Sequence, residues 1–222
     1  MSRRYPRRTA LQLAGSAGLA LALPRVAAAA EPPCRVLQLV GEAWRDAAGA
    51  RAALALGDGL TLGDRVATGV ESKVKLLFVD GSSLILGPES EVGLAVFDPR
   101  PKEGVALFLL LVGTLRISVG ETITWQSFQV QGGTAVASVR GTEWAMQEDP
   151  KGSAIFVIEG EVEVRPRHTS TGSSHETPSP AVPVQVVLQP GEGTDVAPNT
   201  GPSEPKQWGD ARRDKLLALL TL

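Results

Sequence analysis

The residues with the clearest chemical potential in this chain are two charged side chains inside an otherwise apolar stretch. Arg140 and Glu143 stand three positions apart, between Val139 and Trp144. If Gly141 forms a β-bulge, both charges turn to the same side of the sheet and pair there or bond backbone groups. Because a buried guanidinium must be hydrogen-bonded, we expect Arg140 to tie neighbouring strands together, with Glu143 or loop carbonyls as acceptors. Capture of an anionic ligand by Arg140 is the functional alternative.

The residue patterns that enzymes use are not found in the sequence. Its two histidines, His168 and His175, lie seven positions apart in a Ser/Thr/Pro-rich stretch, where they match no zinc pattern and cannot position a serine nucleophile. The single cysteine, Cys34, allows no intrachain disulfide. A cupin-like metalloenzyme is the nearest alternative with a β-fold, and it would need histidines on its strands. Glycoside hydrolysis by paired carboxylates stays an open alternative, because Asp and Glu are plentiful in the turns. We therefore expect a protein that is not an enzyme, with no catalytic residue, cofactor or metal.

The charge distribution argues against a nucleic-acid partner. Within the 222 residues, the first 30 carry five arginines and no acidic residue. The remainder has 17 basic and 24 acidic residues, a net charge of −7. Binding to phosphate backbones needs a clustered positive surface, and the sequence after residue 30 has no such cluster.

Residues 1–30 predict an export signal. A basic start is followed by the 15-residue apolar stretch Thr9–Leu23 and by the small residues Ala28–Ala30, which offer a cleavage site. Arg7-Arg8 resembles a twin-arginine signal, and the ordinary secretory route stays open. The apolar stretch is shorter than the roughly 20 residues of a membrane span. We therefore expect a cleaved signal, no membrane span afterwards, and a location in the periplasm or outside the cell.

From residue 35 onward, short apolar runs alternate with turn residues. Val74, Leu76 and Phe78 share one face of a predicted strand, and this period of two is typical of half-buried antiparallel strands. Turn signals recur every eight to twelve residues, and we expect two strands at Gly104–Val112 and Thr114–Val119. The pattern predicts an all-β antiparallel sandwich over residues 31–200, of jelly-roll or double-stranded β-helix type.

Two regions differ from this pattern. Residues 167–183, rich in Ser, Thr and Pro, predict a mobile loop. Residues 201–222 predict a linker and a short amphipathic helix that is capped by Asp210, with Leu216 and Leu220 on its apolar flank. This flank packs on the sheet or docks a partner or membrane surface, which makes both leucines candidate contact residues.

The tryptophans divide into two groups. Trp144 is expected in the core, because a β-domain ordinarily buries a few large aromatic side chains there. Trp125 stands among polar neighbours, so we expect it to be partly exposed and treat it as a further candidate contact residue.

The turn between two predicted strands is the first of two signatures. Asp80-Gly81 suits a two-residue hairpin loop, because both residues tolerate positive φ, and the Ser82 hydroxyl can close it. Some 60 residues later comes the second signature, Arg140-Gly141-Thr142-Glu143, followed by Trp144. In this order the motifs resemble the FecR domain, an extracytoplasmic module named after the ferric-citrate regulator, in which Phe usually stands at the position of Trp144. The resemblance covers roughly residues 36–197.

This resemblance implies an outer module that acts through protein contact or ligand sensing. The namesake regulators also have a cytoplasmic sigma-binding segment and a membrane span, whereas here a signal precedes the domain, so direct anti-sigma activity is not expected. We expect an exported binding or scaffold module with a protein partner in envelope signalling. The alternatives are a soluble regulator of a membrane sensor and a carbohydrate- or peptidoglycan-binding module, which would align two or more aromatics on one exposed face.

Overall fold

The computed structural model describes residues 31–139, 141–167 and 185–222. The chain divides into two units, Met1–Glu31 and Pro32–Leu222, and the fold below is that of the second. The predicted export signal, the predicted mobile loop apart from Arg167, and Arg140 lie outside the described residues. None of the helices in the described part is long and apolar enough to cross a membrane.

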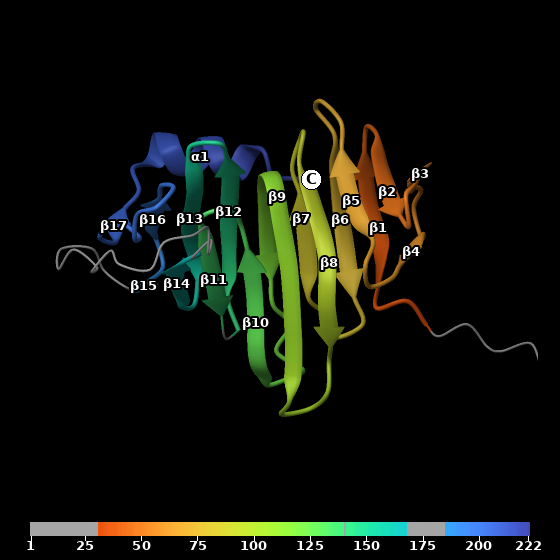
Figure 1. Cartoon of the computed structure of the whole chain (residues 1–222), viewed down its shortest axis with the longest axis horizontal. Helices are drawn as coiled ribbons and strands as arrows, with labels where there is room; N and C mark the ends of the chain where they lie inside the picture. Colours follow the sequence, from red (N-terminus) through yellow and green to blue (C-terminus); the bar gives the residue numbers. More distant parts are fainter. Residues whose placement is uncertain (1–30, 140, 168–184) are drawn as a thin grey trace, which may run out of the picture. The chain divides into compact units, whose positions relative to one another are not determined.

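Strands dominate the second unit, and a short helix, α1, ends it (Figure 1). The elements are β1 (Cys34–Val40), β2 (Ala43–Ala47), β3 (Ala50–Ala53), β4 (Gly59–Leu60), β5 (Arg65–Thr68), β6 (Lys73–Phe78), β7 (Ser83–Leu86), β8 (Glu91–Asp98), β9 (Gly104–Ser118), β10 (Trp125–Gln131), β11 (Ala135–Val139), β12 (Glu143–Asp149), β13 (Gly152–Glu159), β14 (Val162–Pro166), β15 (Val186–Leu188), β16 (Glu192–Val196), β17 (Lys206–Gln207) and α1 (Asp210–Ala218).

The strands form two sheets that share β9. Sheet I has the order β4-β1-β6-β7-β9-β12-β13-β16-β17. Sheet II has the order β3-β2-β5-β8-β9-β10-β11-β14-β15. Neighbouring strands are antiparallel except β9 and β10, which are parallel. Successive hairpins alternate between the sheets, as β6–β7, β8–β9, β12–β13 and β14–β15 do, and the predicted all-β sandwich with a short C-terminal helix is confirmed.

The long strand β9 replaces the two strands that the sequence predicts. It pairs within sheet II up to Val112 and within sheet I from Gly113 onward. Gly113 has a φ of +92°, and a Cβ there would lie 2.1 Å from Ser90 Oγ. The crossing therefore requires glycine for its conformation and for the close approach of Ser90.

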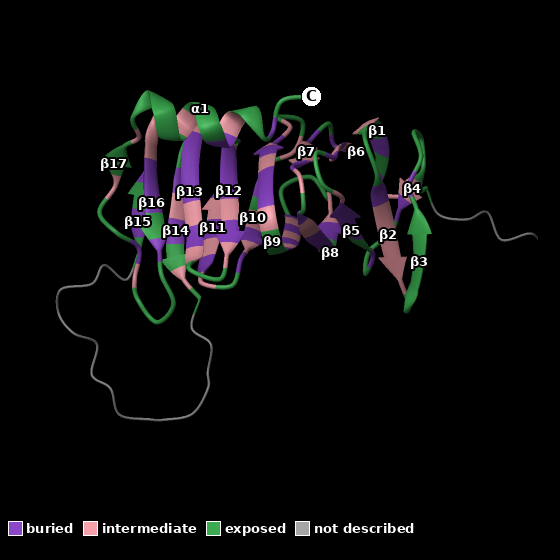
Figure 2. Cartoon of the chain, turned by 90° about the horizontal axis from the view of Figure 1, so that it is seen from above, coloured by how far each residue is buried: buried purple, intermediate pink, exposed green. Residues whose placement is uncertain are grey.

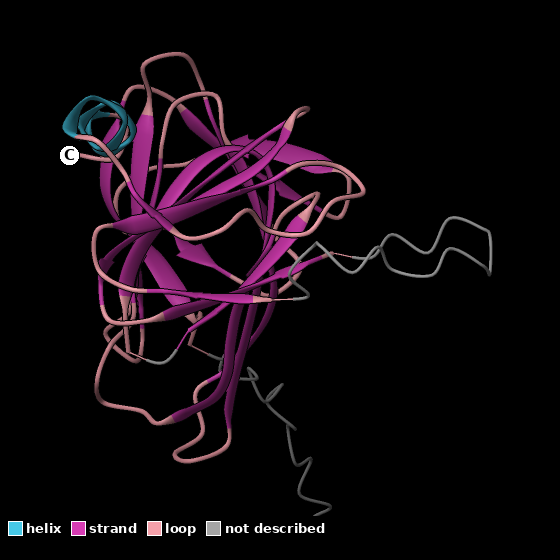
Figure 3. Cartoon of the chain, turned by 90° about the vertical axis from the view of Figure 1, so that its left-hand side faces the viewer, coloured by secondary structure: helices cyan, strands magenta, loops and turns pink. Residues whose placement is uncertain are grey.

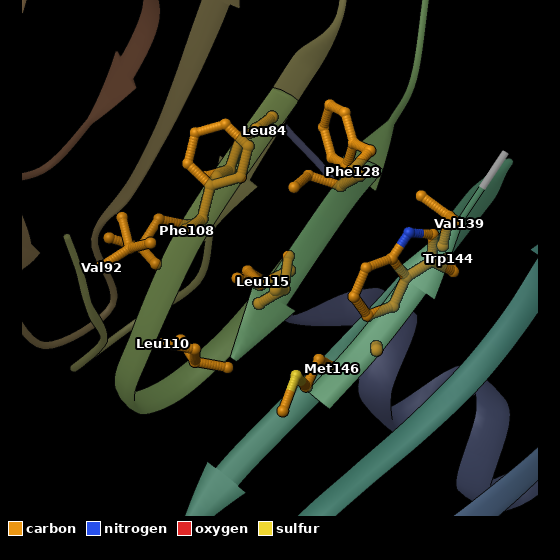
Figure 4. Close-up of a cluster of buried hydrophobic side chains, with 14 of the residues drawn as sticks. Leu84, Val92, Phe108, Leu110, Leu115, Phe128, Val139, Trp144 and Met146 are labelled. Carbon is orange, nitrogen blue, oxygen red and sulfur yellow. The ribbon is translucent and has the colours of Figure 1, made fainter. Parts of the chain in front are cut away.

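The core lies between the two sheets and draws on the inward face of nearly every strand. Figure 4 shows Phe108 and Val92 from sheet II with Leu84 and Trp144 from sheet I in this cluster. All four side chains are buried, and for Leu84, Val92 and Phe108 this follows from the alternation of β7, β8 and β9. Figure 2 shows buried residues along β12 and β13 as well. Each fully buried side chain of this size contributes about 1.5–3 kcal/mol relative to an exposed one.

Helix α1 lies outside the strands, on the outer face of sheet I (Figure 3). Leu216 and Leu220 pack with Ala145 and Phe156 in a second apolar cluster. Gly209 stands at the N-cap without a side-chain cap, so Asp210 is not the predicted cap and instead pairs with Arg213 at 2.9 Å. Extended backbone at Gly209 puts the helix start one residue earlier than the sequence pattern indicated.

Candidate functional site

The outer face of sheet I carries a transverse row of side chains whose chemistry changes across the sheet. The strand registers align them in the order Gln38, Lys75, Ile85, Arg116, Ala145 and Phe156. Helix α1 packs on the apolar members of the row through Leu216 and Leu220. The polar members at the β1–β6 side are left outside the apolar cluster.

A groove of about 210 Å³ lies over this uncovered part, beside the end of the chain. Its lining comes from β1, β6, β7, β9, β12 and the residues after α1, namely Gln38, Lys75, Ser83, Ile85, Arg116, Ser118, Glu143, Leu220, Thr221 and Leu222. Lys73 holds the wall formed by the chain end, because its Nζ donates to the carbonyl oxygens of Ala218 at 2.9 Å and Thr221 at 2.7 Å. The groove is therefore built from five strands of sheet I and a tethered C-terminal wall.

The floor of the groove contains an ion pair that involves the signature residue Glu143. Arg116 Nε donates to Glu143 Oε1 at 2.9 Å, and Arg116 Nη2 lies 2.7 Å from the same oxygen. Both side chains are about one quarter exposed, 27% and 26%, so the pair is partly withdrawn from water. Glu143 thus pairs with Arg116 of β9, and its predicted partner, Arg140, lies outside the described residues. The alternation of Leu115, Arg116 and Ile117 shows that Arg116 points outward, but no local pattern indicates which strand lies opposite.

Lys75 adds a second cation to the groove. It is half-buried, and within the described part of the chain its ammonium group has no hydrogen bond or ion pair. Ile85 stands between Lys75 and Arg116 in the row, so the two cations flank an aliphatic floor. Because neighbouring strands are about 4.8 Å apart, the backbones of Lys75 and Arg116 are about 10 Å apart.

The first signature, Asp80-Gly81-Ser82, forms a closed turn between β6 and β7. Asp80 Oδ1 accepts from Ser82 N at 3.1 Å and Oδ2 accepts from Ser82 Oγ at 2.5 Å, while Gly81 has a φ of +87°. The turn also anchors the loop after β9, because Gly120 N donates to Ser82 Oγ at 2.9 Å and Thr122 Oγ1 to the Asp80 carbonyl oxygen at 2.6 Å. These contacts give the turn a structural role.

The second signature positions β12 against its neighbours. Gly141 has a φ of +65°, and the register between β12 and β13 shifts between Glu143 and Trp144, two positions after the expected bulge. Thr142 is buried, and a Cβ at Gly160 would lie 2.5 Å from its Cγ2. Trp144 is fully buried in the core, where the sequence placed it.

The three candidate contact residues are all buried. Trp125 is 6% exposed and packs on Phe97 and Phe128, with ring centroids 5.5 and 5.2 Å away. Its polar neighbours Thr122, Thr124 and Gln126 are exposed, so they gave a misleading signal. Leu216 is 4% exposed and Leu220 fully buried, because α1 turns this flank onto sheet I. These three side chains are therefore not available to a partner while the fold is intact.

A second polar cluster lies at the other end of β12. Ser153 Oγ donates to Glu148 Oε2 at 2.5 Å, and Thr134 Oγ1 contacts Ser153 Oγ at 2.7 Å. Burial raises the pKa of the Glu148 carboxyl, and the hydrogen bonds from Ser153 and Gly133 oppose this shift. Glu148 is 5% exposed, so the cluster is a buried structural tie.

The described residues contain no group of three or more His, Cys, Asp and Glu side chains that could hold a metal ion. Burial raises the pKa of the Cys34 thiol to about 12, so this thiol is protonated at neutral pH. His168 and His175 lie outside the described residues. The groove offers charge and shape for binding, with one ion pair already formed on its floor.

The two sheets and the short C-terminal helix define an all-β sandwich fold, with a groove on the outer face of sheet I. Residues 64–163 match the family model described as FecR protein, and this stretch contains both signatures. The resemblance to the FecR domain that the sequence indicated is therefore confirmed for residues 64–163, a shorter span than residues 36–197.

Two solved structures are similar to the chain. Both are crystal structures, at 1.65 and 2.50 Å resolution, of a candidate anti-sigma factor from Parabacteroides distasonis ATCC 8503. Each has 16% identity and a TM-score of 0.49, over 69% of this chain. The matches span 64% and 63% of those proteins, less than two thirds of their length. A comparison with the curated proteins found no match.

Proposed function

We propose that the protein is an exported, non-catalytic FecR-type module that acts by protein contact in envelope signalling. The observation that carries the proposal is the groove on sheet I, which is lined by Glu143 of the second signature and left uncovered by α1. A rigid two-sheet core holds this groove, so that a partner meets a preformed surface. The FecR match at residues 64–163 supports regulation as the purpose of the contact.

The carbohydrate-binding alternative finds no support among the aromatic side chains of residues 31–139, 141–167 and 185–222. Trp44 and Trp208 are partly exposed, and each is covered by an arginine, with Arg51 4.8 Å from one ring and Arg212 3.6 Å from the other. The remaining aromatics of these ranges are buried. Sugar-binding sites stack rings on exposed aromatic platforms, and these rings are already occupied.

Site-specific photo-crosslinking in living cells tests the proposal. A photoreactive residue at Gln38, on the groove wall, is expected to capture a protein of the envelope. The same residue at Gln126, an exposed glutamine on β10 of sheet II, is the matched control. Filling the groove with Ser118→Trp should abolish the Gln38 adduct, whereas Ser127→Trp on β10 should leave it intact.

Signalling and export need their own measurements. A deletion strain is expected to show altered transcript levels that the parent and Ser127→Trp restore and that Ser118→Trp does not. Fractionation should place the protein outside the cytoplasm. A Gln38 adduct that survives Ser118→Trp, or equal complementation by both variants, would contradict the assignment of function to the groove.

A further inference from the structure

We infer that the groove on sheet I recognises an acidic segment of its partner, with a carboxylate side chain seated between Lys75 and Arg116 above Ile85. This inference rests on the proposed function and specifies the chemistry of the partner at the same site. The evidence is the charge, burial and order of the side chains along the transverse row.

Lys75 is the side chain that requires a partner. It is half-buried on the outer face of β6, and it forms no ion pair or hydrogen bond with any other described residue. Lys73, two residues earlier on the same face, is occupied by the carbonyl oxygens of Ala218 and Thr221. A cation that is partly removed from water without a counter-charge is stabilised by an incoming carboxylate.

Arg116 can contribute without giving up Glu143. Both of its close contacts, through Nε and Nη2, go to one oxygen, Glu143 Oε1. No contact is found for Arg116 Nη1 among the described residues, which leaves donors for a second acceptor. A carboxylate above Ile85 would be flanked by two cations whose backbones are about 10 Å apart.

The local charge contrasts with that of the chain. Residues 31–222 have a net charge of −7, whereas the charged side chains that line the groove are Lys75, Arg116 and Glu143. Arg116 and Glu143 neutralise each other, so these three side chains sum to +1, and Leu222, the last residue, lines the edge of the groove. Lys75 is therefore the side chain that attracts an acidic segment, against a protein surface that is negative overall. Ile85 supplies an aliphatic floor and Leu220 an aliphatic wall, so an aliphatic neighbour of the carboxylate is also accommodated.

Fluorescence anisotropy with the full-length mature protein tests the inference. The probe is a labelled peptide that alternates leucine and glutamate, compared with peptides in which glutamine or lysine replaces glutamate. The glutamate peptide is expected to bind more tightly than both, and more weakly as salt is added. Lys75→Glu should weaken it by about two- to fivefold, the effect of losing a surface ion pair. Lys151→Glu, an equal charge change at the β12–β13 turn, should leave binding unchanged.

Several outcomes would overturn the inference. Equal binding of the glutamate and glutamine peptides would remove the carboxylate from recognition, and equal competition by inorganic phosphate would make the groove a plain anion site. The Tm of Lys75→Glu must match that of the parent for the comparison to hold. If it does not, Lys75→Gln is used instead, and it is also expected to weaken binding of the glutamate peptide. If the crosslink from Gln38 to the partner persists in Lys75→Glu, the inference of an acidic segment is wrong while the proposed function stands. If the parent protein gives no crosslink that depends on the groove, the proposed function itself is wrong.

Discussion

Replacing Asp80 by alanine should destabilise the protein far more than removing a similar aspartate from an exposed turn. Asp80 is 6% exposed, and its two oxygens accept from the N–H and hydroxyl of Ser82, which is 2% exposed. Asp80→Ala leaves both donors buried without these acceptors, at about 1–3 kcal/mol each. Ser82 Oγ, which also accepts from Gly120 N, loses the carboxylate that orients its hydroxyl. We expect the free energy of unfolding to fall by about 2–4 kcal/mol.

Asp58 provides the matched control for this experiment. Its Oδ2 accepts from Ala55 N at 2.8 Å in an exposed turn, where water replaces the lost acceptor. We expect Asp58→Ala to cost about 1 kcal/mol or less, and Asp80→Asn, which keeps one acceptor, to fall between the two. Urea unfolding monitored by circular dichroism gives the three values. For a domain of this size, Tm of Asp80→Ala should fall by about 5–15 °C. Equal losses for Asp80→Ala and Asp58→Ala would refute the structural role of the signature turn.

Three further substitutions test other parts of the fold. Glu148→Gln should stabilise the protein at pH 7, because burial raises the native pKa of Glu148 and the charged carboxylate is therefore disfavoured in the folded state. The protonated carboxyl contributes stability below its ordinary pKa, and that stability is lost as pH rises. In chemical unfolding, the gain in the free energy of unfolding from Glu148→Gln should shrink toward pH 4, and a gain that stays constant with pH would argue against titration of Glu148. Leu220→Ala empties a fully buried site under α1, so hydrogen exchange in residues 210–218 should accelerate while the sheet amides keep their protection; unchanged exchange would mean that the helix is held by other contacts. Gly120→Ala should lower Tm, since a Cβ there would lie 2.6 Å from the Asp80 carbonyl oxygen, and an unchanged Tm would show that the loop can move away at no cost.

Local patterns in the sequence predict which side chains are buried, because the period of two is a property of each strand. The alternation of Val74, Leu76 and Phe78 is found as predicted. The Asp80-Gly81 turn is present, but the loop is longer than the predicted two residues, since β6 ends at Phe78 and β7 begins at Ser83, and of the pair only Gly81 has a positive φ. The assignment of hairpins to two sheets was not predictable in this way, since it depends on pairing between residues far apart in sequence. Gly113 illustrates the difference, because it reads as a turn signal but is the point where one strand changes sheets.

Local sequence patterns could not predict the position of the groove either, although one signal for it exists. In β12 and β13 the alternation fails, and Ala145 and Phe156 are buried together with their neighbours on both sides. Three consecutive buried apolar residues in an antiparallel strand indicate that something covers its outer face. The amphipathic pattern of α1, with Leu216 and Leu220, supplies that cover. Combining the two signals would have predicted where the helix docks, but not that Arg116 faces Glu143.

The side chains that stop the helix are the ones that define the groove. Extending the cover beyond Ala145 along the row would bury Arg116, Glu143 and then Lys75. Removing charges from water costs more than their pairing returns unless every donor is satisfied. The chain end instead stays at the border, where Lys73 binds the carbonyl oxygens of Ala218 and Thr221. A covering segment from another molecule can succeed where the helix does not, provided that it brings the carboxylate that Lys75 lacks. The polarity of this half of sheet I therefore both limits the packing of the chain on itself and selects what can bind there.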